Sequence, residues 1–95
     1  MAVARLIIEL HLPWAESLKD RRHFVRSLKD RLRHDFNVSV AEVGEAERWQ
    51  RAEIAVVAVS GDRRYLEGLL RRAGEAAVEI LRGQDVGLGE IEFLD

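Results

Sequence analysis

Apolar and polar residues alternate over residues 3–12, VARLIIELHL. One face would carry the larger aliphatic side chains, Leu6, Ile8, Leu10 and Leu12. The other face would carry Ile7 with three polar residues, Arg5, Glu9 and His11. A period of two is typical of a half-buried β-strand. We therefore predict a strand here, and Pro13 and Trp14 end it.

The next segment has helical spacing, and we predict a helix from about Leu18 to His34. Its apolar stripe would contain Leu18, Val25, Leu28 and Leu32, with Phe24 beside it. Ser17 followed by Asp20 resembles a capping box. Arg21 falls inside the apolar arc, so we expect it to reach a carboxylate at the edge of the core.

The pentapeptide SLKDR occurs twice in this segment, at residues 17–21 and 27–31. A shift of ten residues leaves a helix about 80° short of whole turns. Ser17 would then cap the helix, whereas Ser27 would lie in its middle on the outer side. The two copies differ in role, which indicates one amphipathic helix and not two repeated units.

The rest of the chain adds three strands and a second helix. We predict strands over residues 36–43 and 52–60, the second one apolar enough to be central and covered on both faces. A helix capped at Ser60-Gly61-Asp62 would run to about Arg82, before Gly83. The last segment, VGLGEIEFL, changes phase after Leu88, which suggests a bulge.

The element order βαββαβ predicts a ferredoxin-like α+β sandwich. We expect one domain over residues 1–95, with a four-stranded antiparallel sheet in the order 4-1-3-2. Both helices would cover one face of that sheet.

Composition narrows the classes of function. The chain has no cysteine, which excludes disulfide scaffolds, thiolate metal sites and cysteine nucleophiles. The apolar run at the start is too short to span a bilayer and contains Glu9 and His11, so we expect a cytoplasmic protein. Arginine outnumbers lysine thirteen to two. This bias fits a thermophile and equally fits GC-rich codon usage.

The motifs of common enzymes are missing from the sequence. His23 and His34 lie about 16 Å apart along the predicted helix, too far to share a metal ion. Gly87-Leu88-Gly89 opens no helix, and there is no phosphate-binding GxxxxGK[ST] loop. We therefore predict a protein that is not an enzyme, with no cofactor, no metal site and no catalytic residues.

Positive charge gathers on the first helix although the formal net charge of the chain is −2. Five cations fall within about 80° on the helical wheel: Lys19, Arg22, Arg26, Lys29 and Arg33. Such a stripe can bind the phosphates of a nucleic acid. It can equally be a solvated face, with Asp20 and Asp30 making local ion pairs.

The sheet face away from the helices offers a second candidate surface. Ile7, Val57 and Val59 would point outward there, and an apolar face of this kind rarely stays bare. Trp49 lies in the polar loop that follows the second strand and would either cover the sheet edge or anchor a partner. Glu42 and Gln50, across this hairpin, would bind a partner or hold the loop.

Three stretches, SLKDRR, LKDRLRHDFNVSVAEV and WQRAEIAVV, together resemble the YlxP-like family of small bacterial proteins of unknown function. The resemblance runs nearly the full length of the chain. It implies a ferredoxin-like fold and no known catalytic residues. It also implies a gene neighbourhood shared with a translation initiation factor and a ribosome-binding factor.

Three functions follow as hypotheses. The first is a binding module whose basic helix contacts RNA, with ribosomal RNA or a ribosomal subunit as partner. The second is a protein-interaction or homodimerisation module that uses the open sheet face and the Trp49 loop. The third is a small-molecule site in a pocket lined by Glu9, His11, Glu42 and Gln50.

Overall fold

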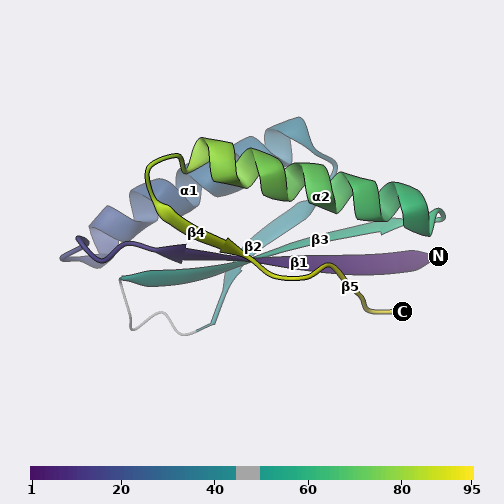
Figure 1. Cartoon of the computed structure of the whole chain (residues 1–95), viewed down its shortest axis with the longest axis horizontal. Coiled ribbons are helices and arrows are strands. Elements are labelled where there is room, and N and C mark those ends of the chain that lie inside the picture. Colours follow the sequence, from purple (N-terminus) through teal and green to yellow (C-terminus); the bar gives the residue numbers. More distant parts are fainter. Residues whose placement is uncertain (45–49) are drawn as a thin grey trace.

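Two helices lie on the same side of an antiparallel sheet in the computed structural model, which describes residues 1–44 and 50–95 (Figure 1). The elements are, in chain order, β1 (Ala2–His11), α1 (Leu18–Asp35), β2 (Ser39–Val43), β3 (Arg51–Ser60), α2 (Arg63–Ile80), β4 (Asp85–Leu88) and β5 (Glu92–Phe93). The sheet has the order β2-β3-β1-β4, and β5 also pairs with β1. The predicted α+β sandwich and its strand order are confirmed.

The core lies between the sheet and the helices. β1 and β3 are antiparallel, with Leu6 opposite Val56 and Ile8 opposite Ile54. These side chains are buried beneath the buried leucines of the two helices, which are Leu28, Leu32, Leu66, Leu69 and Leu70. The alternation that predicted β1 therefore corresponds to a strand with one buried face.

The start of α1 follows the sequence expectation in its cap but not in its first turn. Ser17 Oγ accepts a hydrogen bond from the backbone N–H of Asp20 at 3.3 Å, and the Asp20 carboxylate accepts one from the N–H of Glu16 at 3.0 Å. Leu18, expected in the core, is exposed. Its position is at the edge of the arc of buried residues, and the core-facing position of the first turn belongs to Arg21.

The second strand is shorter than its sequence predicts. It begins at Ser39 instead of Phe36. The N–H of Phe36 donates to the carbonyl of Leu32, and the N–H of Val38 donates to the carbonyl of Phe36, both at 2.9 Å. Residues 36–38 therefore complete the helix end and the turn, although Phe36 and Val38 still pack against the core as expected.

The predicted bulge in the last segment is confirmed by the register of the strands. Leu88 lies opposite Ile8, whereas Glu92 lies opposite Arg5. The last segment therefore holds one more residue than β1 over this interval, which shifts the phase of its side chains. The extra residue explains why Val86 and Phe93 both pack against the core in spite of their odd spacing.

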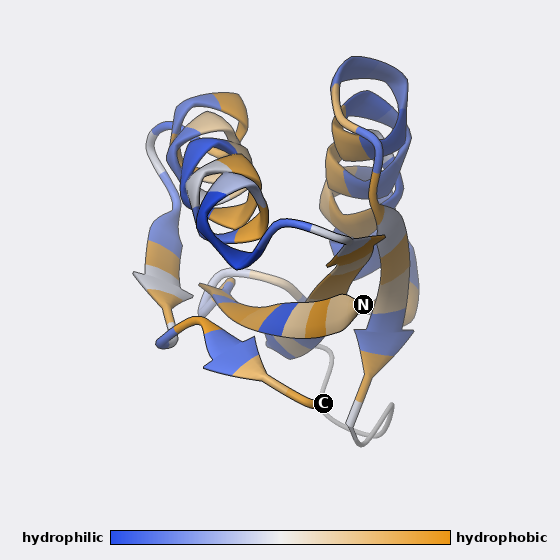
Figure 2. Cartoon of the chain, turned by 90° about the vertical axis from the view of Figure 1, so that its right-hand side faces the viewer, coloured by the Kyte–Doolittle hydropathy of each residue, from blue (hydrophilic) through white to orange (hydrophobic). Residues whose placement is uncertain are grey.

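Both helices lie on the same side of the sheet, as the view along the molecule shows (Figure 2). The opposite side, which we call the open face, is not covered by any helix of the described chain. β3 is central as expected, but within residues 1–44 and 50–95 it is covered on one face only. Neither α1 nor α2, the helices of the described residues, is long and apolar enough to cross a membrane.

Candidate functional site

A line of cations runs along the outer side of α1. Lys19, Arg22 and Arg26 are exposed, and Lys29 is half-buried. We call these four residues the basic face. Within the described part of the chain, none of the four forms an ion pair with a carboxylate. Two of the three acids of α2 pair with arginines of their own part of the chain, Glu67 with Arg71 and Glu79 with Arg82.

Arg33, the fifth cation of the predicted stripe, has a different role. Its guanidinium donates a hydrogen bond to the backbone carbonyl of Val40 at 2.5 Å. Val40 lies in β2, the strand at the end of the sheet. The carbonyl oxygen of an edge strand would otherwise be available to another chain. Arg33 therefore covers the edge of β2, and we leave it out of the basic face.

A shallow hollow follows the exposed side of α1. Its volume is about 580 Å³, and its lining combines three cations of the basic face with other polar residues: Lys19, Arg22, His23, Arg26, Ser27 and Asp30. His23 packs edge-on against Phe24, with 5.3 Å between ring centroids. Asp30 contributes the single negative charge in this lining. The hollow can receive an anionic group that also accepts hydrogen bonds.

Arg21 forms a buried ion pair with Glu42, which confirms the expectation that it reaches a carboxylate. The Arg21 side chain is 6% exposed and that of Glu42 is 29% exposed. Arg21 also donates to the backbone carbonyl of Arg51 at 3.2 Å. Glu42 lies near the end of β2, and Arg51 begins β3. A single guanidinium thus joins both sides of the β2–β3 connection to α1.

The remaining residues predicted to contact a partner do not all lie on one surface. Ile7, Val57 and Val59 lie on the open face as expected, and Val59 is 60% exposed. Gln50 is exposed, and its backbone carbonyl accepts a hydrogen bond from the N–H of Leu12 at 2.7 Å. Trp49 lies outside the described residues. Glu42 lies on the helix side of the sheet and is bound by Arg21.

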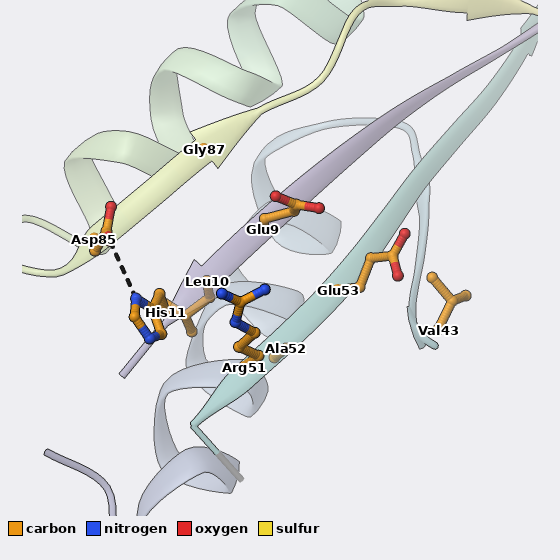
Figure 3. A pocket seen from close by; sticks show the side chains of 9 residues that line it. All are labelled: Glu9, Leu10, His11, Val43, Arg51, Ala52, Glu53, Asp85 and Gly87. Carbon is orange, nitrogen blue, oxygen red and sulfur yellow. Dashed lines mark hydrogen bonds and ion pairs between the residues drawn. The ribbon is translucent and has the colours of Figure 1, made fainter. Parts of the chain in front are cut away.

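A pocket of about 540 Å³ lies at the end of the open face where β1 finishes (Figure 3). Glu9 from β1 and Glu53 from β3 lie directly opposite each other there. His11 Nδ1 lies 3.3 Å from a carboxylate oxygen of Asp85, and Arg51 also lines the pocket. A side chain at residue 44 would displace the Glu53 carboxylate. A Cβ there would lie 2.8 Å from Glu53 Oε2, and Gly44 also has a positive φ of 86°.

Only part of the pocket matches the lining expected from the sequence. Glu9 and His11 line it, whereas Glu42 and Gln50 do not. Three charged lining residues, Arg51, Glu53 and Asp85, were missed. Their outward phase was readable from the sequence, but placing them beside Glu9 requires the strand register. Among the described residues, no three His, Asp or Glu side chains could hold a metal ion, and none of the described lining residues is a serine, threonine or lysine.

Comparison with known proteins places the chain among uncharacterised relatives. It is 38% identical over 58 residues to "Uncharacterized protein YlxP" of Bacillus subtilis (strain 168), an alignment that covers 61% of this chain. The alignment spans 63% of that relative, which is less than two thirds of its length.

Two solved structures share the fold. A C-terminal segment of the alpha subunit of aIF2 from Pyrococcus abyssi gives a TM-score of 0.57 at 17% identity, covering 90% of this chain and 48% of that one. The de novo designed protein Foldit4 gives 0.53 at 15% identity, covering 96% and 94%. Likeness at such identities shows the fold alone.

The family follows from the sequence. Residues 3–84 match the family described as "Protein of unknown function (DUF503)". This match covers most of the chain and agrees with the alignment to the Bacillus subtilis protein. The resemblance to the YlxP-like family is thereby confirmed, and the chain belongs to the DUF503 family.

Proposed function

We propose that this protein is a non-enzymatic module that binds RNA through the basic face of α1. The observation that carries the proposal is that Lys19, Arg22, Arg26 and Lys29 share one side of the helix without a carboxylate partner in the described chain. Arg21, by contrast, has a structural role, because its buried side chain is bound to Glu42.

The arrangement suits a phosphate backbone. Lys19 and Lys29 are ten residues apart, which corresponds to about 15 Å along a helix. Cations spread over that length can neutralise several successive phosphates and release their counterions. His23 and Ser27, in the same hollow, add hydrogen-bonding groups for phosphate or ribose oxygens. The formal net charge of −2 means that the attraction is local to α1.

Ribosomal RNA is the first partner to test, because the resemblance to the YlxP-like family implies a gene neighbourhood concerned with translation. A structured ribosomal fragment and an unstructured single strand of equal length are suitable probes. The two probes separate recognition of folded RNA from general binding to phosphates. With ribosomal RNA as its partner, the protein would act in the cytoplasm.

The experiment is fluorescence anisotropy over a salt series. Neutralisation of about four phosphates predicts a slope near −3 for the logarithm of the binding constant against the logarithm of salt concentration. Reversal of Arg22 and Arg26 to Glu should remove most of the binding. The matched control reverses Arg64 and Arg72, exposed residues of α2, and changes the net charge equally.

Two results would contradict the proposal. Flat anisotropy at low salt would show that the basic face is only solvated. Equal loss of binding in the α1 and α2 variants would show a general effect of net charge instead of a site on α1.

The second candidate function is docking of a protein partner through the open face and the Trp49 loop. Two observations favour it: Val59 is exposed, and in the described chain no helix covers the outer side of β3. The oligomeric state of the purified protein tests this candidate, because an open face that is covered by a second copy is not available to another protein.

A further inference from the structure

The open face carries an ordered pattern of charge around an apolar centre. Along β1 the outward residues are Arg5, Ile7 and Glu9, so a cation and an anion flank an isoleucine at equal distances. Ile7 lies opposite Ala55, and Ala55 lies opposite Ala41 on β2. The row through Ile7 is therefore apolar, with two small side chains beside the isoleucine. A second sheet could approach it to the spacing of about 10 Å that is usual for stacked sheets.

The two carboxylates at the anionic end of this pattern face each other, and Arg51 lines the same pocket without an ion pair to either in the described chain. Glu9 and Glu53 lie directly opposite on antiparallel strands, where like charges are destabilising. Within residues 1–44 and 50–95 no cation pairs with either carboxylate. Arg5, at the other end, pairs with Glu92 at 2.6 Å through one nitrogen. A guanidinium has five N–H donors, so Arg5 can bind a further carboxylate.

Two symmetric ways of stacking a second copy on this face differ in their electrostatics. A two-fold axis parallel to the strands keeps each row in place and sets the Glu9–Glu53 row against its own copy. A two-fold axis across the strands through Ile7 exchanges the Arg5 row with the Glu9 row. The first arrangement brings four carboxylates together, whereas the second sets Arg5 of each copy against Glu9 of the other and Glu53 against Val57.

We propose that the open face binds a second copy of this chain, in an antiparallel face-to-face contact centred on Ile7. Ile7 packs on Ile7 of the second copy, and Arg5 of each copy pairs with Glu9 of the other. The apolar side chains beside Ile7, including Val57 and Val59, are buried at the same time. The contact is isologous, as most dimer interfaces are, and it is independent of nucleic-acid binding by α1.

The first test measures mass by sedimentation equilibrium on the purified full chain. A dimer has about twice the 10.8 kDa of one chain. Ile7→Asp should shift the protein to a monomer at the same concentration, because two carboxylates would meet at the centre of the contact. Urea unfolding of Ile7→Asp checks that the chain still folds. A wild-type monomer at about 100 μM, or a dimer that a folded Ile7→Asp variant retains, overturns the proposal.

The second test uses charge exchange, which does not depend on disrupting the apolar centre. Arg5→Glu and Glu9→Arg should each weaken self-association by at least about tenfold, since each places like charges together at both ends of the contact. Arg5→Glu combined with Glu9→Arg should restore it. A mixture of the two single variants should form heterodimers, in which every pair is again complementary.

The control for these variants is Arg72→Glu, an exposed position on α2, which should leave self-association unchanged. If the double variant folds but stays as weak as the single variants, or if the mixture forms no heterodimer, the antiparallel pairing of Arg5 with Glu9 is wrong. In that case the face binds a second copy in another register, or a different protein.

Discussion

At the scale of single residues, the ion pair between the buried Arg21 and the partly exposed Glu42 joins α1 to β2. An arginine within the apolar arc of a helix needs a partner, because an uncompensated buried charge is costly. Glu42 supplies the carboxylate and the carbonyl of Arg51 supplies a further acceptor. The pair therefore connects the first turn of α1 to both strands that border residues 44–50.

Removal of the Glu42 carboxylate should destabilise the protein. We expect Glu42→Ala to lower the free energy of unfolding by about 2–3 kcal/mol, below the usual range for a buried pair because Glu42 is partly exposed. The double variant Arg21→Leu with Glu42→Leu should recover most of this loss, since the buried charge is then gone. Urea unfolding measures both. Equal stability of Glu42→Ala and the wild type would show that the pair contributes nothing.

Asp95 gives a prediction about pH. The backbone N–H of Val3, which donates to its carboxylate at 3.3 Å, is the main cause that holds the pKa of Asp95 below its ordinary value, and Arg63 adds to it. A lowered pKa means that the stabilisation is fully present above the unfolded pKa. It is lost as pH falls through the folded pKa. NMR titration should show the Val3 amide and the Asp95 carboxyl changing with one midpoint, below that of an exposed aspartate.

The control for this titration is Asp95→Asn, in which the Val3 amide shift should no longer change over the same acid range. An Asp95 midpoint at the ordinary value for aspartate would contradict the role given to the Val3 N–H.

At the scale of elements, α1 with its N-cap contains the pentapeptide SLKDR twice, and the two copies lie in different local environments. Ser17 is the N-cap and binds the N–H of Asp20, while Ser27 lies exposed in the middle of the same helix. Leu28 of the second copy is buried, whereas Leu18 of the first is exposed. Helical rotation and position relative to the cap thus decide what each copy of the pentapeptide does.

This difference between the two serines can be measured directly. Ser17→Ala should lower the free energy of unfolding by about 1 kcal/mol, because an N-cap acceptor is lost. Ser27→Ala should be neutral or raise it by up to about 0.5 kcal/mol, since alanine has the higher helix propensity. Thermal or urea unfolding of the two single variants is sufficient. Similar losses in both would show that the repeat acts as two equivalent units.

At the scale of the whole molecule, the two proposed surfaces lie on different sides of the sheet. The basic face is on α1, and Figure 2 shows both helices on one side of the sheet. Stacking of two open faces would leave the helices of both copies on the outside. The two basic faces would then point away from each other, so one short RNA could not reach both.

The separation of these surfaces predicts that each can be removed alone. The variant with Arg22→Glu and Arg26→Glu should keep the dimeric mass while it loses RNA binding. Ile7→Asp should become monomeric and keep the same RNA affinity per chain, with one short RNA bound per chain in both states. Sedimentation and anisotropy on the same preparations test this. Loss of RNA binding in a folded Ile7→Asp variant would show that the dimer contact forms part of the RNA site.

Much of the fold was readable from local patterns, because burial on one face imposes a period of two on strands and of 3.6 on helices. The alternation around Ile8 predicted β1, and the phase change after Leu88 predicted the extra residue in the last segment. The turn at Phe36 and the exposure of Leu18 could not be read in this way. Both depend on where a helix end meets the sheet, which is a tertiary matter.

The sequence by itself determined the element order, the N-cap at Ser17 and the line of cations on one side of α1, because each depends on residues close along the chain. The strand order followed from the element order, because the sequence βαββαβ is typical of the ferredoxin-like arrangement. Only the tertiary structure decided what these side chains contact. It placed Arg33 on the carbonyl of Val40, Glu42 on Arg21 and Glu9 opposite Glu53. Those contacts join residues distant in sequence, so they follow from strand register and helix docking.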